Sequence, residues 1–448
     1  MDLLKTDIKK LFFHYLAAAF GSALISSIYG IVDMAMVGQY QGPNGTAALA
    51  AVAPVWNILY SLGLMFGIGG TVLFSKLRGE SKENEKRSNE YFTISIMLTI
   101  LFSLLSFLVL YFFQDSILTF FGADSTLLPL AKNYLKPVLW VAPLFLFNQQ
   151  LAAFLRNDND PLLATIAVLA GGVFNVFGDW LFVFFMNWGI YGAGFATSLG
   201  ALITFICLLI HFIKKKNTLK FVKPTKILKK SGMIIEHGFP VFIVDFAMGI
   251  MTVVFNRQIG KFLGNDALSV YGIIINVSTI VTCCSYSIGQ AAQPIFSSNF
   301  GAGNKDRIKE TLKYSLIVCA TFSIFWTVLS IGFPIAYIKL FMKPTDEVLE
   351  IGPKIIRLYS TSFLLLTFNV FSTYYFESLT KAKISLSVSV LRGVILSVIF
   401  IEVFPYIFPV DSLWLSMTAV EVLTFAFVVY EIIKQTKRLP EKSKTLNQ

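Results

Sequence analysis

Charged residues are scarce in this chain of 448 residues. They make up 14% of the sequence, whereas a soluble globular protein carries about 25%. Hydrophobic residues make up 55%, and the mean hydropathy is +0.69. This composition excludes an ordinary soluble domain and indicates an integral membrane protein.

Histidine and cysteine are also rare, with three and four residues, and no His and Cys share metal-ligand spacing. The histidines His14, His211 and His237 lie near predicted span ends, where we expect interfacial positions. The sequence has no Gly-x-x-x-x-Gly-Lys motif, no paired Asp-rich motif and no catalytic histidine inside a span. It therefore predicts neither an ATP-driven pump nor an enzyme, and no cofactor beyond a coupling ion.

Long apolar runs are what the chain has in abundance. A helix needs about 20 apolar residues to cross a bilayer. Twelve runs approach or exceed that length, so the sequence predicts an all-α integral membrane protein of twelve transmembrane helices. These runs lie at 12–38, 47–76, 91–113, 130–154, 161–186, 192–213, 233–260, 267–298, 312–337, 351–378, 384–408 and 412–433.

The chain repeats itself at half its length. Residues 67–79 share their Gly, Phe-Ser and Gly positions with residues 289–301, at an offset of 222. Phe147-Asn148 matches Phe368-Asn369 at an offset of 221. Two six-span lobes of equal orientation, related by an axis along the membrane normal, are typical of alternating-access transporters. The expected divisions are an N-lobe at 1–213, a basic linker at 214–232, a C-lobe at 233–433 and a tail at 434–448.

Basic residues gather on one side of the predicted spans. Of the 37 Lys and Arg, 28 lie in the termini and in the connections that follow even-numbered spans. The positive-inside rule therefore predicts that both termini are cytoplasmic, in a bacterial cytoplasmic membrane. We expect the basic linker to lie on anionic lipid headgroups rather than on nucleic acid.

A few polar side chains interrupt the apolar runs of the first half. Ionisable groups inside a bilayer are costly, so they indicate function by default. Asp33 lies in the first span, Asn175 and Asp179 lie one helical turn apart in the fifth, and Thr197 lies in the sixth. Such a group could bind Na⁺ through oxygen ligands, or protons, because two nearby carboxylates tend to share one. The alternative is structural: Asp33 caps a helix break and Asp179 lies at the interface.

The second half holds further buried charge. An arginine in a span needs a counter-ion, and Glu421 or Asp245 is the expected partner of Arg392. The two alternatives are a structural ion pair and a role in substrate binding or proton coupling. The C-lobe candidates are Asp245, Asn276, Asn369, Arg392 and Glu421.

Several segments together resemble one family. Residues 32–38, 142–148, 156–161, 171–179, 188–197 and 293–304 are similar, in order, to motifs of the multidrug and toxic compound extrusion (MATE) family, and the MepA-like bacterial branch in particular. The resemblance implies the MATE fold of two pseudo-symmetric six-helix lobes. It also implies export of cationic, amphipathic drugs in exchange for H⁺ or Na⁺. The family's N-lobe cation site maps onto Asp33, Asn175, Asp179 and Thr197.

The sequence departs from the family in places. No proline lies between His14 and Val37, so a proline-driven bend of the first span is not expected. The Na⁺ site of the NorM branch uses a Glu in span 7 and an Asp in span 10. Span 10 here has no central Asp, so that C-lobe site is not expected.

We therefore predict a monomeric multidrug antiporter whose partners are small organic cations and membrane lipids. Flexible Met and aromatic side chains would suit flat cations. A lipid-linked precursor flippase is the alternative, and it would need a strongly cationic cavity. The substrate-lining candidates are Tyr29, Met34, Met36, Trp56, Met65, Gln149 and Tyr271.

Overall fold

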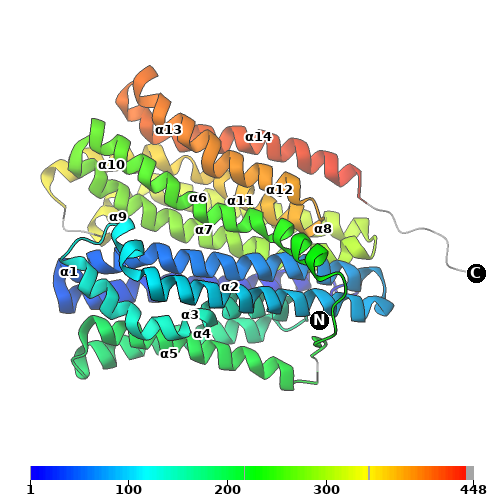
Figure 1. The fold of residues 1–448 in the computed structure, drawn as a ribbon. Coiled ribbons are helices and arrows are strands. Elements are labelled where there is room, and N and C mark those ends of the chain that lie inside the picture. Colours follow the sequence, from blue (N-terminus) through cyan, green and yellow to red (C-terminus); the bar gives the residue numbers. More distant parts are fainter. Residues whose placement is uncertain (1, 216, 342–343, 440–448) are drawn as a thin grey trace, which may run out of the picture. The chain divides into compact units, whose positions relative to one another are not determined.

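The computed structural model describes residues 2–215, 217–341 and 344–439. The side chains of residues 24, 26–29, 31, 43, 82, 245 and 265 also lie outside the description. The described chain forms helices and short connections (Figure 1), and it contains no strand. It divides into two compact units, Met1–Thr6 with Phe13–Phe242, and Asp7–Phe12 with Ile243–Gln448.

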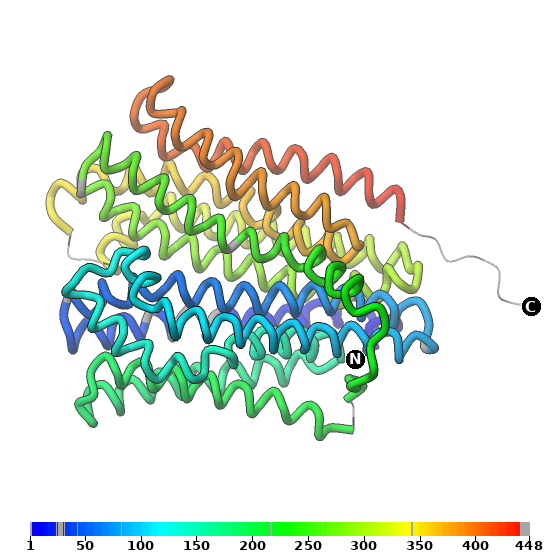
Figure 2. Tube along the Cα trace, in the orientation of Figure 1, coloured from blue at the N-terminus to red at the C-terminus, as the bar shows by residue number. Residues whose placement is uncertain are grey.

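The first unit is built from long helices that lie side by side (Figure 2). The longest, α1, is broken at Gly42, which adopts the left-handed φ of 68° that glycine tolerates. Helix α6 begins in this unit and continues into the second. The bounds are α1 Ile8–Glu80, η1 Lys82–Asn84, α2 Glu85–Phe120, α3 Leu127–Asn157, α4 Pro161–Asp179, η2 Trp180–Phe185, α5 Gly189–Leu209, η3 Ile210–Ile213 and α6 Ile227–Phe262.

The second unit repeats this plan. Helices α7, α8 and α14 each pack against α11. The bounds are α7 Gly264–Gly301, α8 Lys305–Gly332, α9 Pro334–Phe341, α10 Asp346–Ser360, α11 Phe363–Ser378, α12 Ala382–Val390, η4 Leu391–Ile395, α13 Leu396–Ile407, η5 Val410–Leu415 and α14 Ser416–Lys437.

Ten described helices are long and apolar enough to cross a membrane, or eleven if α10 and α11, bent by 41°, form one span. The predicted first span, 12–38, falls in the part of α1 before Gly42, which is helical. The prediction of an all-α protein with many membrane spans is confirmed, and the count of twelve is approximate.

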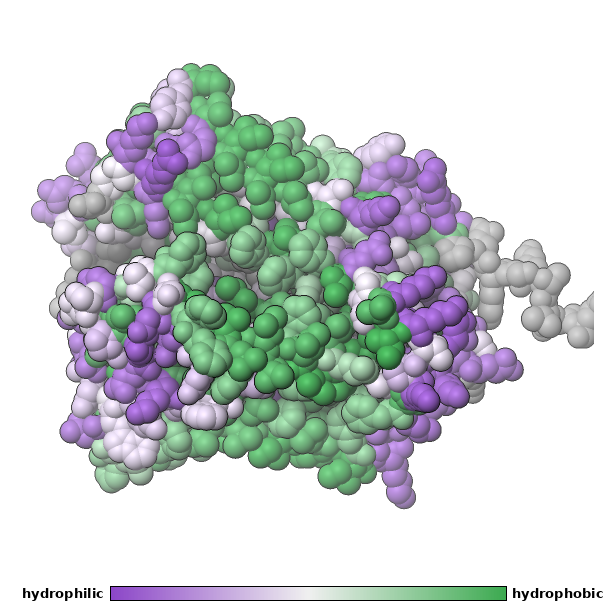
Figure 3. All heavy atoms as spheres, in the orientation of Figure 1, coloured by the Kyte–Doolittle hydropathy of each residue, from purple (hydrophilic) through white to green (hydrophobic). Residues whose placement is uncertain are grey.

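The surface suits a bilayer because large apolar side chains face outward. On the face in Figure 3, hydrophobic residues cover the middle of the helices and hydrophilic residues gather near helix ends. Phe112 on α2 is 69% exposed and Val253 on α6 is 68% exposed. Lipid tails can cover such side chains at no cost, whereas water cannot.

Glycines allow close helix crossings in the first unit. A Cβ on Gly63 would lie 2.6 Å from the carbonyl oxygen of Leu146, and one on Gly69 would lie 2.0 Å from that of Ile234. Any larger side chain would force these helices apart. The glycine-rich stretch 63–70 therefore serves helix packing.

The internal repeat extends to a buried hydrogen bond. The Asn148 amide on α3 donates to the backbone oxygen of Ala201 at 2.9 Å. At the equivalent place in the second unit, the Asn369 amide on α11 donates to the backbone oxygen of Glu421, also at 2.9 Å. In both units one asparagine thus ties neighbouring helices together through a main-chain acceptor.

Candidate functional site

Four polar residues lie close together inside the first unit, three of them buried and Thr197 half-buried. Asp33 comes from α1, Asn175 and Asp179 from the end of α4, and Thr197 from α5. Asn175 and Asp179 are four residues apart, so they lie on one face of α4. Asp33 is 8% exposed and Asp179 is fully buried.

The residue that joins this group is Tyr134 on α3. Its hydroxyl donates to Asp33 Oδ2 at 2.9 Å and lies 3.2 Å from Thr197 Oγ1. Asn175 Nδ2 donates to the same Thr197 oxygen at 3.1 Å. Sequence reasoning did not identify Tyr134, because a tyrosine in a span gives no signal until its neighbours are known.

The site is polar but incompletely hydrogen-bonded. Among the described residues, neither carboxylate oxygen of Asp179 has a hydrogen-bond partner, and Asp33 Oδ1 and Asn175 Oδ1 also lack one. Asp179 lies within electrostatic reach of Asp33 and of the Tyr134 hydroxyl. Buried polar atoms without partners are unusual and need an explanation.

This arrangement can hold a small positive charge. Two carboxyl groups, an amide oxygen and two hydroxyls are hard oxygen donors, which accept protons or bind Na⁺. No group of three or more His, Cys, Asp and Glu able to hold a metal ion occurs in the described part of the chain. A site for a transition metal is therefore not indicated among those residues.

A second buried polar group lies in the second unit. Arg392, in the short π-helix η4, donates through Nε to Glu421 Oε1 at 2.8 Å. The Asn369 amide donates to the other Glu421 oxygen at 2.6 Å. Glu421 is thus an ion-pair partner of Arg392 among the described residues. The side chain of Asp245 lies outside the described residues.

Asn276 does not join this group. It is exposed, and its amide donates to the backbone oxygen of Gly272 in its own helix at 3.0 Å.

A family model, MatE, matches residues 18–181 and 240–401, which is most of the chain. The chain belongs to the MATE family. The predicted resemblance is confirmed, and both units carry one copy of the matching region.

Named relatives of this MATE protein include multidrug export protein MepA from two staphylococci. The protein of Staphylococcus aureus (strain NCTC 8325 / PS 47) is 26% identical over 89% of this chain and 88% of its own length. The protein of Staphylococcus haemolyticus (strain JCSC1435) is 25% identical over 96% of this chain and 94% of its own length.

Solved structures share the fold of this MATE chain. A MATE protein in complex with MaL6 superposes with a TM-score of 0.89 at 18% identity, over 98% of each chain. An outward-facing multidrug resistance MATE transporter of the MOP superfamily superposes with a TM-score of 0.88 at 18% identity, over 97% of this chain and 98% of its own. The MATE fold is therefore shown for nearly the whole length.

The predicted substrate-lining residues of this MATE protein have different environments. Trp56 packs on Phe145 at 4.5 Å between ring centroids and stands edge-on to Tyr134 at 6.3 Å. Met65 is buried in a hydrophobic cluster, and Tyr271 is buried among aromatic rings. Met34 is exposed, Met36 and Gln149 are half-buried, and the Tyr29 side chain lies outside the described residues.

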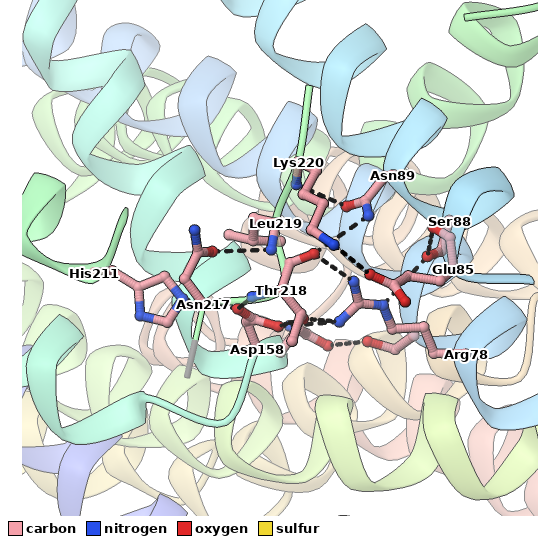
Figure 4. Close-up of polar contacts among 12 residues, drawn as sticks. Arg78, Glu85, Ser88, Asn89, Asp158, His211, Asn217, Thr218, Leu219 and Lys220 are labelled. Carbon is pink, nitrogen blue, oxygen red and sulfur yellow. Dashed lines mark hydrogen bonds and ion pairs between the residues drawn. The ribbon is translucent and has the colours of Figure 1, made fainter. Parts of the chain in front are cut away.

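A further polar cluster of the first unit holds the start of the linker in place. Figure 4 shows segment 217–220 running between side chains from several helices. Asp158, at the end of α3, accepts from the Thr218 backbone N–H at 2.9 Å and from Arg78 Nη1 at 3.0 Å. Arg78 also donates to the Thr218 backbone oxygen at 2.9 Å.

His211 belongs to the same cluster and is fully buried within the protein. It lies in η3, directly after α5 and thus near the end of the predicted sixth span, and its interfacial position stays a prediction. Its ring lies between Asp158 and Asp160, at 2.8 Å and 3.1 Å. Asp160 lies between spans. Burial by itself raises the pKa of the Asp160 carboxyl. Hydrogen bonds from Lys214 and His211 lower it by more than burial raises it, so the pKa lies below its usual range.

Proposed function

We propose that this chain is a secondary active multidrug exporter that exchanges cationic, amphipathic drugs for protons, with Na⁺ as the alternative coupling ion. The observation that supports this most is the Asp33–Tyr134–Thr197–Asn175 hydrogen-bond network beside the buried Asp179, whose carboxylate oxygens have no described partner. The names of the MepA relatives agree with drug export.

The mechanism follows from charge. With both aspartates ionised, the site carries negative charge, and no described basic residue forms an ion pair with it. Proton binding removes that charge and lets a carboxyl group donate as well as accept hydrogen bonds. The hydrogen bonds of Tyr134 to Asp33 and Thr197 can then rearrange, because a protonated carboxyl group can donate to the phenol oxygen. The helices α1, α3, α4 and α5 would then pack in one arrangement when the site is protonated and in another when it is not. The two arrangements would differ in drug affinity and would open to opposite sides of the membrane.

The other expectations belong to the same proposal. The Asp33, Asn175, Asp179 and Thr197 group acts as the coupling site. Both termini are cytoplasmic, the membrane is the bacterial cytoplasmic membrane, and the protein works as a monomer on small organic cations.

The test is drug efflux from proteoliposomes under separate pH and Na⁺ gradients. We expect a pH gradient alone to drive ethidium transport, and Asp33→Asn and Asp179→Asn each to reduce it by about 100-fold. Asp115→Asn is the matched control, because Asp115 is exposed and pairs with Lys132 on the surface at 2.7 Å.

Other outcomes separate the alternatives. Transport driven by Na⁺ alone and lost in the same variants would make the group a sodium site. Unchanged transport in both variants would contradict its role in coupling. If neither the pH gradient nor the Na⁺ gradient drove drug transport, the lipid-linked precursor flippase would be favoured.

A further inference from the structure

The ring of His211 has a carboxylate at each of its two nitrogens. Nε2 lies 2.8 Å from Asp158 Oδ2, and Nδ1 lies 3.1 Å from Asp160 Oδ2. Both distances are those of hydrogen bonds. The side chains of His211 and Asp158 are 0% and 1% exposed, so water does not replace the contact between them.

The partners of the ring indicate how many protons it carries. A neutral imidazole has one N–H, so it would donate to one carboxylate and turn a lone pair toward the other, whereas an imidazolium donates to both. The carboxyl groups themselves are held in the ionised form. Asp158 accepts from Arg78 Nη1 at 3.0 Å, and Asp160 accepts from Lys214 Nζ at 2.8 Å. These contacts fit a ring that carries two protons.

The two oxygens that face the ring also hold the start of the basic linker. Asp158 Oδ2, which faces Nε2, accepts from the Thr218 backbone N–H at 2.9 Å. Asp160 Oδ2, which faces Nδ1, is the oxygen to which Lys214 Nζ donates. Each of these attachments of segment 214–218 therefore uses an oxygen that the histidine ring contacts.

Other charged and titratable groups surround the ring at a greater distance. Arg78 on α1 donates to Asp158, and Glu85 on α2 lies within electrostatic reach of Arg78. Tyr15 on α1 lies within electrostatic reach of Asp158 and Asp160. The two groups that contact the ring nitrogens directly are both acidic, so they favour a positive charge on the ring.

We propose that His211, Asp158 and Asp160 form a proton-binding site, and that the bound proton keeps the start of the basic linker attached to the first unit. Loss of the proton would leave a nitrogen lone pair facing a carboxylate oxygen. Repulsion would move that oxygen away from the ring, and one attachment of segment 214–218 would move with it. The linker start is therefore held at lower pH and loosened as the pH on the predicted cytoplasmic side rises. This goes beyond the proposed drug exchange and does not depend on it.

The first test is the protonation of the ring, measured by NMR on the full-length protein in lipid bilayers with ¹⁵N-labelled histidine. The chain has three histidines, so the spectrum is simple, and the ring missing in His211→Gln is assigned. At about pH 7.5 we expect both nitrogens of this ring to carry protons. Asp160→Asn should lower the ratio of doubly to singly protonated ring about tenfold. Asp115→Asn, which removes an exposed carboxylate elsewhere in the first unit, should leave the ratio unchanged.

The second test is hydrogen–deuterium exchange of segment 214–218, expressed as a protection factor, which corrects for the direct effect of pH on exchange. In the wild-type protein we expect protection to fall roughly tenfold between about pH 6 and about pH 9. Glutamine does not titrate in this range, so His211→Gln should show no such fall. The internal control is the Thr225 N–H, which donates to Glu90 at 2.6 Å and should keep its protection throughout.

Two results would overturn the proposal. A single protonated nitrogen on the wild-type ring at about pH 7.5 would mean that the two carboxylates do not hold the extra proton. The same pH dependence of protection in the wild type and in His211→Gln would mean that the proton does not hold the linker. If His211→Gln does not fold, Asp160→Asn replaces it, and an unchanged pH dependence there has the same meaning. Neither measurement uses a drug or an ion gradient, so failure of the drug-exchange proposal would not alter them.

Discussion

At the scale of single residues, Tyr134 gives the buried site its connectivity. One hydroxyl contacts an acidic side chain from α1 and a hydroxyl from α5, while Asp179 is left without a described partner. A phenol can switch between donating to a carboxylate and accepting from a protonated carboxyl. It is therefore suited to follow a change in protonation at Asp33.

Tyr134→Phe tests this role. The change removes both hydrogen bonds and leaves Asp33 Oδ2 unpaired, and hydrogen bonds to charged groups contribute about 1.5–3 kcal/mol. We expect the rate of pH-driven drug efflux to fall roughly tenfold or more. Tyr91→Phe is the control, since among the described residues the Tyr91 hydroxyl makes one hydrogen bond, to the Met233 sulfur at 3.7 Å. Wild-type efflux in Tyr134→Phe would show that the hydroxyl is not used.

At the scale of elements, the linker is attached to the first unit from its beginning. Asp158 fixes the Thr218 N–H, Asn89 Oδ1 accepts from the Lys220 N–H at 3.1 Å, and Glu90 accepts from the Thr225 N–H at 2.6 Å. Side chains near the ends of α2 and α3 thus replace the backbone partners that an irregular segment lacks. The basic linker is held by protein contacts as well as by any lipid surface.

Asp158→Asn tests the attachment. The amide keeps the shape but removes the charge that Arg78 and His211 contact, so we expect the backbone N–H of Thr218 to exchange with deuterium about tenfold faster. Glu85→Gln is the matched control, because the Glu85 ion pair with Lys220 is exposed. Unchanged exchange at Thr218 in Asp158→Asn would mean that the other contacts suffice to hold the segment.

At the scale of the whole molecule, the two repeats share a framework and differ in chemistry. The asparagine bond to a main-chain oxygen occurs in both units, at Asn148 and Asn369. The second unit adds a carboxylate at the acceptor position, where Glu421 replaces Ala201 and pairs with Arg392. In the first unit, the corresponding buried acids, Asp33 and Asp179, form no ion pair with a described basic residue.

This difference predicts unequal costs of the same substitution. Asn148→Ala removes one neutral hydrogen bond, worth about 0.5–1.5 kcal/mol. Asn369→Ala also removes a bond to the buried Glu421 carboxylate, so it should cost about 1.5–3 kcal/mol more. Thermal unfolding in detergent measures both, and each serves as the other's control. Equal losses would mean that the Asn369 contact to the carboxylate contributes nothing.

Much of the protein could be predicted because its signals are local. Apolar runs of bilayer length, spaced basic connections and a repeat at half the chain length are properties of the sequence itself. They determined a helical membrane protein with two related halves, since a bilayer permits little else for such segments. The i, i+4 spacing likewise placed Asn175 and Asp179 on one face.

Tertiary structure alone decided which distant residues meet. It brought Tyr134 between Asp33 and Thr197, made Glu421 the partner of Arg392, and buried His211 between two aspartates. These contacts depend on how each helix is rotated about its axis and where it crosses its neighbours. The packing of all side chains at close crossings sets that rotation, so no single segment encodes it.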